Sequence, residues 1–143
     1  MKETTFKNNG IFSDAMWQGI LKHIDPNHIT DMDILDIRPG YAYVSLKTDN
    51  SNQNLYGYTH GGTIFTLCDL ASGMAVYAYG VTDVTLQGSI NYLKPAICDI
   101  IYAEATTARK GNRTAVTRVE VTDANKELLA IATFTMYITS EIK

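Results

Sequence analysis

The longest apolar stretch of the chain runs from Thr63 to Tyr79 and contains one charged residue, Asp69. It holds no proline, it is too long for a strand, and apolar side chains occupy nearly every side of a helical projection. A helix that is hydrophobic all round belongs in a core. The pattern therefore predicts a buried central helix that opens at Gly61-Gly62 and runs towards Gly80.

The segments on either side of this stretch have different patterns. Before it, Ser13 or Asp14 is a candidate cap for a short helix that ends before Pro26. After it, residues alternate as in strands, and Gly88 marks a bulge or a close approach. The expected strands are 32–38 and 41–47, joined by a turn at Pro39-Gly40, and then 84–93, 100–108, 115–122 and 128–138. This order predicts one α+β domain over residues 1–143, with an antiparallel sheet wrapped around a helix and residues 1–28 as an N-terminal extension.

Composition narrows the classes of function. A length of 143 residues fits one domain, and a net charge of −3 argues against general nucleic-acid binding. Asp69 and Ser72 lie inside the apolar stretch and its flanks lack basic anchors, which argues against a membrane protein; no leader sequence is expected either. The two cysteines, Cys68 and Cys98, have no CxxC spacing and favour a cytoplasmic location. The three histidines lack ligand spacing, so no metal site is expected.

The apolar stretch also contains candidate chemistry. A carboxylate inside such a helix is costly unless it is paired or functional, which makes Asp69 a candidate base. Gly61 and Gly62 allow close approach of a ligand, and the first N–H groups of a helix have no partners within it. These donors would stabilise negative charge on a carbonyl oxygen, as in an oxyanion hole. The side-chain amide of Asn54 is a candidate for the same position.

The spacing of these groups has a consequence for assembly. Gly61 and Asp69 are eight residues apart, which on a helix is about 12 Å. One reacting carbonyl cannot be within reach of both. Two antiparallel copies of the helix would bring Gly61 of one chain towards Asp69 of the other. The sequence therefore predicts a homodimer with shared sites.

Two motifs carry a family resemblance. The first is Asn, then His-Gly-Gly six residues on, then Asp, and it reads here Asn54, His60-Gly61-Gly62 and Asp69. The second is a small hydroxyl residue followed by a strand that ends in Tyr-x-x-Pro-Ala, here Thr85 through Tyr92-Leu-Lys-Pro95-Ala96. With the order of elements, these resemble the hotdog fold and, more closely, the PaaI-like (phenylacetyl-CoA thioesterase-like) acyl-CoA thioesterases of the 4-hydroxybenzoyl-CoA thioesterase superfamily. The resemblance extends from about Ile29 to Ile138.

The resemblance implies an acyl-CoA substrate, no cofactor beyond the CoA that is part of this substrate, and dimers that often pair into tetramers. Asp69 would be the general base that activates water, or a nucleophile that forms a mixed anhydride. The N–H of Gly61 would polarise the thioester carbonyl, Asn54 would help to orient it, and Thr85 would hold the attacking water. His60 and Gly62 complete the helix entrance, His60 mainly through packing and hydrogen bonds. The candidates for contacts with the CoA phosphates are Lys94, Arg109, Lys110 and Arg113.

Other interpretations remain open from the sequence. Asp69 can be a structural acid held by neighbouring hydroxyls, Asn54 can cap a turn, and Lys110-Gly-Asn-Arg113 can be a solvated turn. A non-catalytic module that binds acyl-CoA is a second function for the same fold. A dehydratase or hydratase is a third, although it needs a His and an acid facing one substrate. The sequence leaves open whether the acyl group is aromatic or aliphatic, and whether its carrier is CoA or an acyl-carrier protein.

Overall fold

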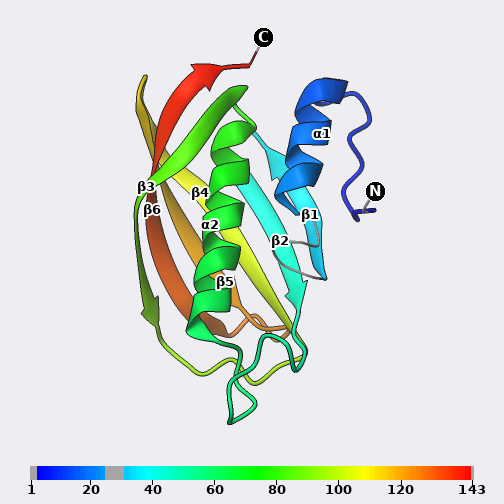
Figure 1. Ribbon diagram of the computed structural model, residues 1–143, viewed down its shortest axis with the longest axis vertical. Helices are drawn as coiled ribbons and strands as arrows, with labels where there is room; N and C mark the ends of the chain where they lie inside the picture. Colours follow the sequence, from blue (N-terminus) through cyan, green and yellow to red (C-terminus); the bar gives the residue numbers. More distant parts are fainter. Residues whose placement is uncertain (1–2, 25–30, 143) are drawn as a thin grey trace.

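The computed structural model describes residues 3–24 and 31–142, and within them the chain forms two helices and six strands (Figure 1). Their bounds are α1 Asp14–His23, β1 Met32–Arg38, β2 Tyr41–Lys47, α2 Gly61–Tyr77, β3 Val81–Tyr92, β4 Ile100–Lys110, β5 Thr114–Thr122 and β6 Leu128–Glu141. The strands form one antiparallel sheet in the order β1-β2-β4-β5-β6-β3. The central helix α2 lies along one face of this curved sheet, which is the predicted α+β architecture.

Both helices begin where the sequence predicts. The side chain of Ser13 caps α1 by accepting a hydrogen bond of 3.2 Å from the N–H of Met16. Pro26, which was expected to follow α1, lies outside the described residues. The apolar pattern continues to Tyr79, but α2 ends at Tyr77. The chain turns there because Gly80 takes a φ of +88°, a conformation that few other residues adopt.

Two neighbouring strands at one edge of the sheet, β3 and β6, are longer than predicted. Strand β3 begins at Val81, directly after this turn, and β6 continues to Glu141. Val81 of β3 pairs with Glu141 of β6, so the added residues of each strand are hydrogen-bonded to those of the other. No helix in the part of the chain that the structure describes is both long and apolar enough to cross a bilayer.

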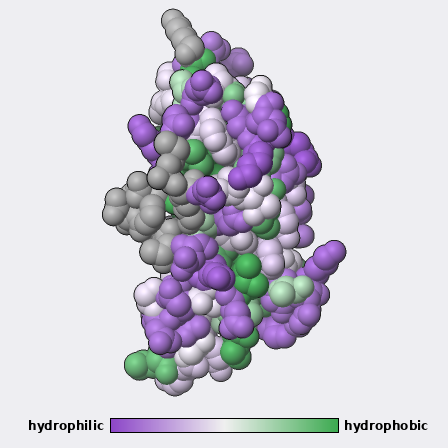
Figure 2. Space-filling model, turned by 90° about the vertical axis from the view of Figure 1, so that its right-hand side faces the viewer, coloured by the Kyte–Doolittle hydropathy of each residue, from purple (hydrophilic) through white to green (hydrophobic). Residues whose placement is uncertain are grey.

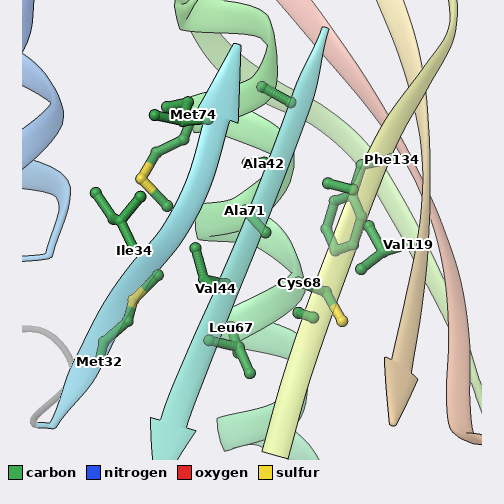
Figure 3. Close-up of a cluster of buried hydrophobic side chains, with 14 of the residues drawn as sticks. Met32, Ile34, Ala42, Val44, Leu67, Cys68, Ala71, Met74, Val119 and Phe134 are labelled. Carbon is green, nitrogen blue, oxygen red and sulfur yellow. The ribbon is translucent and has the colours of Figure 1, made fainter. Parts of the chain in front are cut away.

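The core lies between α2 and the sheet. Figure 3 shows Leu67, Ala71 and Met74 of the helix beside the first strands of the sheet. All three are fully buried, as are their neighbours Met32, Ile34 and Val44. Burial of a large aliphatic side chain stabilises the fold by about 1.5–3 kcal/mol, so this face fixes α2 firmly on the sheet. Another face of α2, away from Leu67, Ala71 and Met74, contacts β3.

Candidate active site

One face of α2 lies along β3, and it is formed by every fourth residue from Gly61 to Gly73. Residues four apart are neighbours on a helix surface, so they form one row, which we call the β3-facing row. Each member of the row meets a different residue of β3. The pairs are Gly61 with Tyr92, Phe65 with Gly88, Asp69 with Thr85, and Gly73 with Asp83. The helix and the strand therefore run antiparallel, with a carboxylate midway along their contact.

The middle pair brings together two predicted site residues. Asp69 is half-buried, and its Oδ1 accepts a hydrogen bond of 2.5 Å from the hydroxyl of Thr85. Thr85 donates its only hydroxyl proton in this bond, so its oxygen remains able to accept a hydrogen bond from water. A water bound there would lie next to the carboxylate. The pair can thus hold and deprotonate a nucleophilic water.

A bulge in β3 turns Thr85 towards the helix. Side chains alternate along a strand, so Thr85 and Gly88 would face opposite sides of a regular one. The register with β6 shifts between Thr85 and Gln87, and both Thr85 and Gly88 face α2. A Cβ on Gly88 would lie 2.5 Å from the ring of Phe134, so the predicted close approach at Gly88 is confirmed. Bulges of this kind often re-aim side chains near active sites.

The helix entrance presents backbone donors. In the chain as described, no acceptor binds the N–H groups of Gly61 or Gly62. The hydroxyl of Tyr92 donates a hydrogen bond of 2.5 Å to the carbonyl oxygen of Gly61, and a Cβ on Gly61 would lie only 3.0 Å from the Tyr92 ring. Burial raises the pKa of Tyr92, so this hydroxyl stays protonated at neutral pH. The free N–H groups and the helix dipole favour negative charge at this end.

Asn54 and His60 flank the entrance in different ways. The side-chain oxygen of Asn54 accepts hydrogen bonds from the N–H groups of Tyr56 and Tyr58, at 2.9 and 3.1 Å. This is the turn-capping role that the sequence allowed, and it fixes the amide so that its NH₂ group has no partner among residues 3–24 and 31–142. His60 is the exposed N-cap residue of α2 and makes no capping hydrogen bond with its side chain.

A cavity of about 300 Å³ opens beside the helix entrance. Asn54, Gly61 and Lys94, three of the predicted site residues, lie in its wall. The other residues that line it are Tyr58, Thr59, Ile64, Tyr92, Leu93, Pro95 and Ala96. Asp69 does not line this cavity. Because α2 is one continuous helix, Asp69 lies about 12 Å beyond Gly61 along its axis. Within a single chain, the candidate base and the free N–H groups of the helix entrance are therefore far apart.

The four basic candidates for CoA contacts are not brought together. Lys94 lines the cavity, but its ammonium group forms an ion pair of 2.6 Å with Glu127. The other three, Arg109, Lys110 and Arg113, belong to the β4–β5 hairpin. The Nζ of Lys110 lies 5.5 Å from the ring centre of Tyr79, next to the C-terminal end of α2. Within one chain this hairpin therefore lies near the C-terminal end of α2 (Figure 1), whereas the cavity opens at the other end of the helix, beside Gly61.

Two further side chains belong to this region and were not assigned a role from the sequence. Tyr92 entered the sequence analysis only as part of the Tyr-x-x-Pro-Ala motif, whereas its hydroxyl bonds the first turn of α2. Asp83 lies on the same side of β3 as Thr85, and burial raises its pKa to about 7, with a further contribution from the charge of Asp69. A signal for Asp83 was present, because residues two apart on a strand share a face. Its orientation towards the helix could not be read from the sequence.

Other chemistry is poorly supported at this site. Burial raises the pKa of the Cys68 thiol to about 12, so the thiolate needed for nucleophilic attack is not populated at neutral pH. In the described part of the chain, no three or more His, Cys, Asp or Glu residues gather as a potential metal site.

Comparison with known proteins connects this geometry to a family. A family model described as thioesterase superfamily matches residues 56–130. A protein from Archaeoglobus fulgidus named "Putative esterase" is 34% identical over 114 residues, which cover 79% of this chain and 74% of that protein. The acyl-coenzyme A thioesterase PaaI of Escherichia coli is 27% identical over 101 residues, covering 70% of this chain and 72% of PaaI.

Solved structures agree with this result. A hypothetical thioesterase from Streptococcus pneumoniae, with coenzyme A, superposes with a TM-score of 0.83 at 35% identity and covers 88% of this chain and 98% of its own. Structures of an aspartate-to-alanine and a threonine-to-alanine mutant of a hypothetical thioesterase from the same organism have TM-scores of 0.76 and 0.75 at 38% identity, covering 78% of this chain and 93% of theirs. The two replaced residues are sixteen positions apart, as are Asp69 and Thr85.

Proposed function

This chain belongs to the thioesterase superfamily and has the hotdog fold, and on that premise we propose that it is an acyl-CoA thioesterase that hydrolyses its substrate to a free acid and CoA. The observation that carries the proposal is the hydrogen bond from Thr85 of β3 to Asp69, the one carboxylate of an otherwise apolar helix. Named relatives include an acyl-CoA thioesterase and a CoA-bound thioesterase structure, and they support the same class of substrate.

In the proposed reaction, water bound to Thr85 attacks the thioester carbonyl while Asp69 takes its proton. The carbonyl oxygen becomes negative and is stabilised by the N–H of Gly61 from the partner subunit, with the free amide of Asn54 beside it. When the carbonyl reforms, the C–S bond breaks, CoA leaves as a thiolate, and the proton on Asp69 passes to that sulfur or to solvent. Asp69 can also attack directly and form a mixed anhydride, which water then hydrolyses.

Two observations support a site shared across a homodimer. The first is the separation of about 12 Å between Gly61 and Asp69 along α2. The second is the outer edge of β3, which pairs with no strand in the described chain. Antiparallel pairing of β3 with its copy would bring the start of one β3 to the end of the other, and so Asp69 of one chain towards Gly61 of its partner.

The same pairing offers a route for CoA. The backbone N–H of Ile138 bonds the carbonyl of Arg113, and Ile138 pairs with Asp83 near the start of β3. In the proposed dimer, the basic β4–β5 hairpin of one subunit would therefore approach the cavity of the other. Arg109, Lys110 and Arg113 could then meet the CoA phosphates while the cavity receives the thioester end.

We further propose that residues 1–143 act as one domain, that dimers pair into tetramers, and that the protein works in the cytoplasm.

The direct test is release of free thiol from short, medium, long and aromatic acyl-CoAs by the wild type and by Asp69→Asn. The amide keeps the shape of the side chain but cannot take the proton, so turnover should fall by roughly 100-fold or more. Asp99→Asn, at an exposed position, is the matched control and should keep wild-type turnover. Full activity of Asp69→Asn would refute the mechanism, and tight binding of acyl-CoA without thiol release by the wild type would favour a binding module instead.

A further inference from the structure

A second carboxylate lies beside the proposed catalytic pair. Asp83 and Thr85 are two positions apart on β3 and face the same way, towards α2. Asp69 and Gly73 are one helical turn apart on the β3-facing row. The Oδ1 of Asp83 lies 3.6 Å from the position that a Cβ on Gly73 would occupy. Asp69, Thr85 and Asp83 thus form one cluster between the helix and the edge strand.

The surroundings of Asp83 do not neutralise its charge. Within the described residues, its carboxylate accepts no hydrogen bond and forms no ion pair. From α2 it faces Asp69 and Tyr77, and both interact with it electrostatically. On β6 it pairs with Ile138, and the nearest charged residue of that strand is the exposed Glu141. A carboxylate without a partner in partly buried surroundings is costly, which calls for a compensating role.

We propose, on the basis of the thioesterase function above, that Asp83 is a positioning residue whose negative charge promotes proton transfer to Asp69. When both carboxylates are ionised, two like charges face the same narrow space. Transfer of the water proton to Asp69 removes one of these charges and relieves their repulsion. The repulsion between the two carboxylates is weaker in the transition state than in the ground state, so it lowers the barrier to attack by water. Turnover should therefore rise as Asp83 loses its proton.

The pH at which Asp83 loses its proton depends on its partly buried position beside Asp69. Burial raises the pKa of Asp83 to about 7, and the neighbouring Asp69 adds to the rise. The ionisation of Asp83 thus falls within the working pH range of a cytoplasmic enzyme and can be observed in its kinetics.

The test is the pH profile of kcat between pH 6 and 9 for the wild type, for Asp83→Asn and for the control Asp99→Asn. The wild type and the control should rise by roughly two- to fivefold around pH 7, the range expected for a modest change in base strength. Asp83→Asn should stay flat at the lower level, because its amide never becomes charged. The same step near pH 7 in Asp83→Asn would overturn the proposal while leaving the thioesterase activity itself established.

Thermal unfolding of the same variants separates this role from a purely structural one. Because the folded pKa of Asp83 lies above its ordinary value of 3.8, the contribution of this group to stability is fully present below pH 4 and is lost as the pH rises through about 7. Asp83→Asn should lose this decline and melt several degrees above the wild type at pH 8.5. A changed melting profile with an unchanged kcat profile would show that Asp83 is only buried, and would refute its role in proton transfer.

Discussion

The two edges of the sheet differ in how they meet solvent. The β1 edge is short and protected: it has seven residues, and the N-terminal segment covers it. The N–H of Phe6 bonds the carbonyl of Ile34 at 2.9 Å, and the N–H of Thr5 bonds the carboxylate of Asp33 at 2.7 Å. Hydrophilic side chains dominate the face on this side of the molecule (Figure 2). Such an edge resists pairing with another strand.

The β3 edge has none of these protections. It is twelve residues long, and no described segment covers its outer side. Two apolar side chains near its middle, Val84 and Leu86, are 55% and 63% exposed. Its one charged residue, Asp83, faces the helix instead of solvent. Long, apolar, unpaired edges are templates for a further strand, which here we propose to be a second copy of β3.

The difference between the edges explains where the candidate site lies. Thr85 and Tyr92 are β3 residues, and they contact Asp69 and Gly61 on the β3-facing row. No predicted catalytic residue belongs to β1. The candidate catalytic residues therefore lie along the unpaired edge, where the proposed partner subunit would extend the sheet.

Charging the open edge should have the largest effect. Leu86 is the extra residue at the bulge between Thr85 and Gln87, and Leu86→Lys places a positive charge where the partner strand would lie. We expect this variant to become monomeric and to lose roughly 100-fold or more in turnover, because one chain alone cannot align the carbonyl with both halves of the site. Light scattering after size-exclusion chromatography and a thiol-release assay measure the two effects.

The matched control lies on the other edge. Leu35 is the extra residue at the bulge of β1, between Ile34 and Asp36, and it is half-buried. Leu35→Lys should lower the melting temperature slightly but leave both mass and turnover close to wild type. If both variants had the same mass in solution and the same turnover, the two edges would not differ in their role in assembly. A monomeric, fully active Leu86→Lys would refute the shared site.

Mixed dimers give the next largest effect. A Cβ on Gly61 would crowd the Tyr92 ring at 3.0 Å, so Gly61→Ala should displace the helix entrance, while Asp69→Asn removes the base. Each variant alone should be nearly inactive. Co-expression should restore roughly a quarter of wild-type activity, because half of the dimers are mixed and each mixed dimer holds one intact site. The thiol-release rate of the co-expressed mixture is the measurement, and the mixed dimer purified through its tags should reach about half of the wild-type rate. No gain over the parent variants would place both groups in one chain.

The sequence predicted the elements of this fold because their signals are local. The apolar stretch around Asp69 indicated a buried helix, and the alternation in 32–38 and 41–47 gave strands with those bounds. The Ser13 cap and the close approach at Gly88 were predicted for the same reason. The end of α2 was missed by two residues, since the apolar pattern continues through the turn before Gly80.

The contacts across the site were harder to predict because they depend on register. Whether Asp83 and Thr85 face the helix is decided by the bulge at Leu86, whereas the only local signal, Gly88, lies two residues further on. The hydrogen bond from Tyr92 to Gly61 joins residues 31 positions apart and follows from how α2 lies along β3. The pairing of Lys94 with Glu127 likewise appears only when the ends of β3 and β6 are brought together. The catalytic roles themselves stay predictions.

We expect the smallest effect from removing a single tyrosine hydroxyl. Two such hydroxyls lie against a glycine, one at each edge of the sheet, and can be compared. Tyr92 bonds the carbonyl of Gly61 at the open edge, whereas the Tyr79 hydroxyl packs against Gly40 in the β1–β2 turn. Tyr92→Phe removes one hydrogen bond worth about 1 kcal/mol and should lower kcat by roughly two- to tenfold with little change in KM, because the Gly61 N–H loses its fixed orientation. Tyr79→Phe removes the same atom away from the site and should leave kcat unchanged. Steady-state kinetics of both variants test whether the Tyr92 hydroxyl contributes to turnover. Equal values of kcat would mean that its contact with α2 serves folding alone.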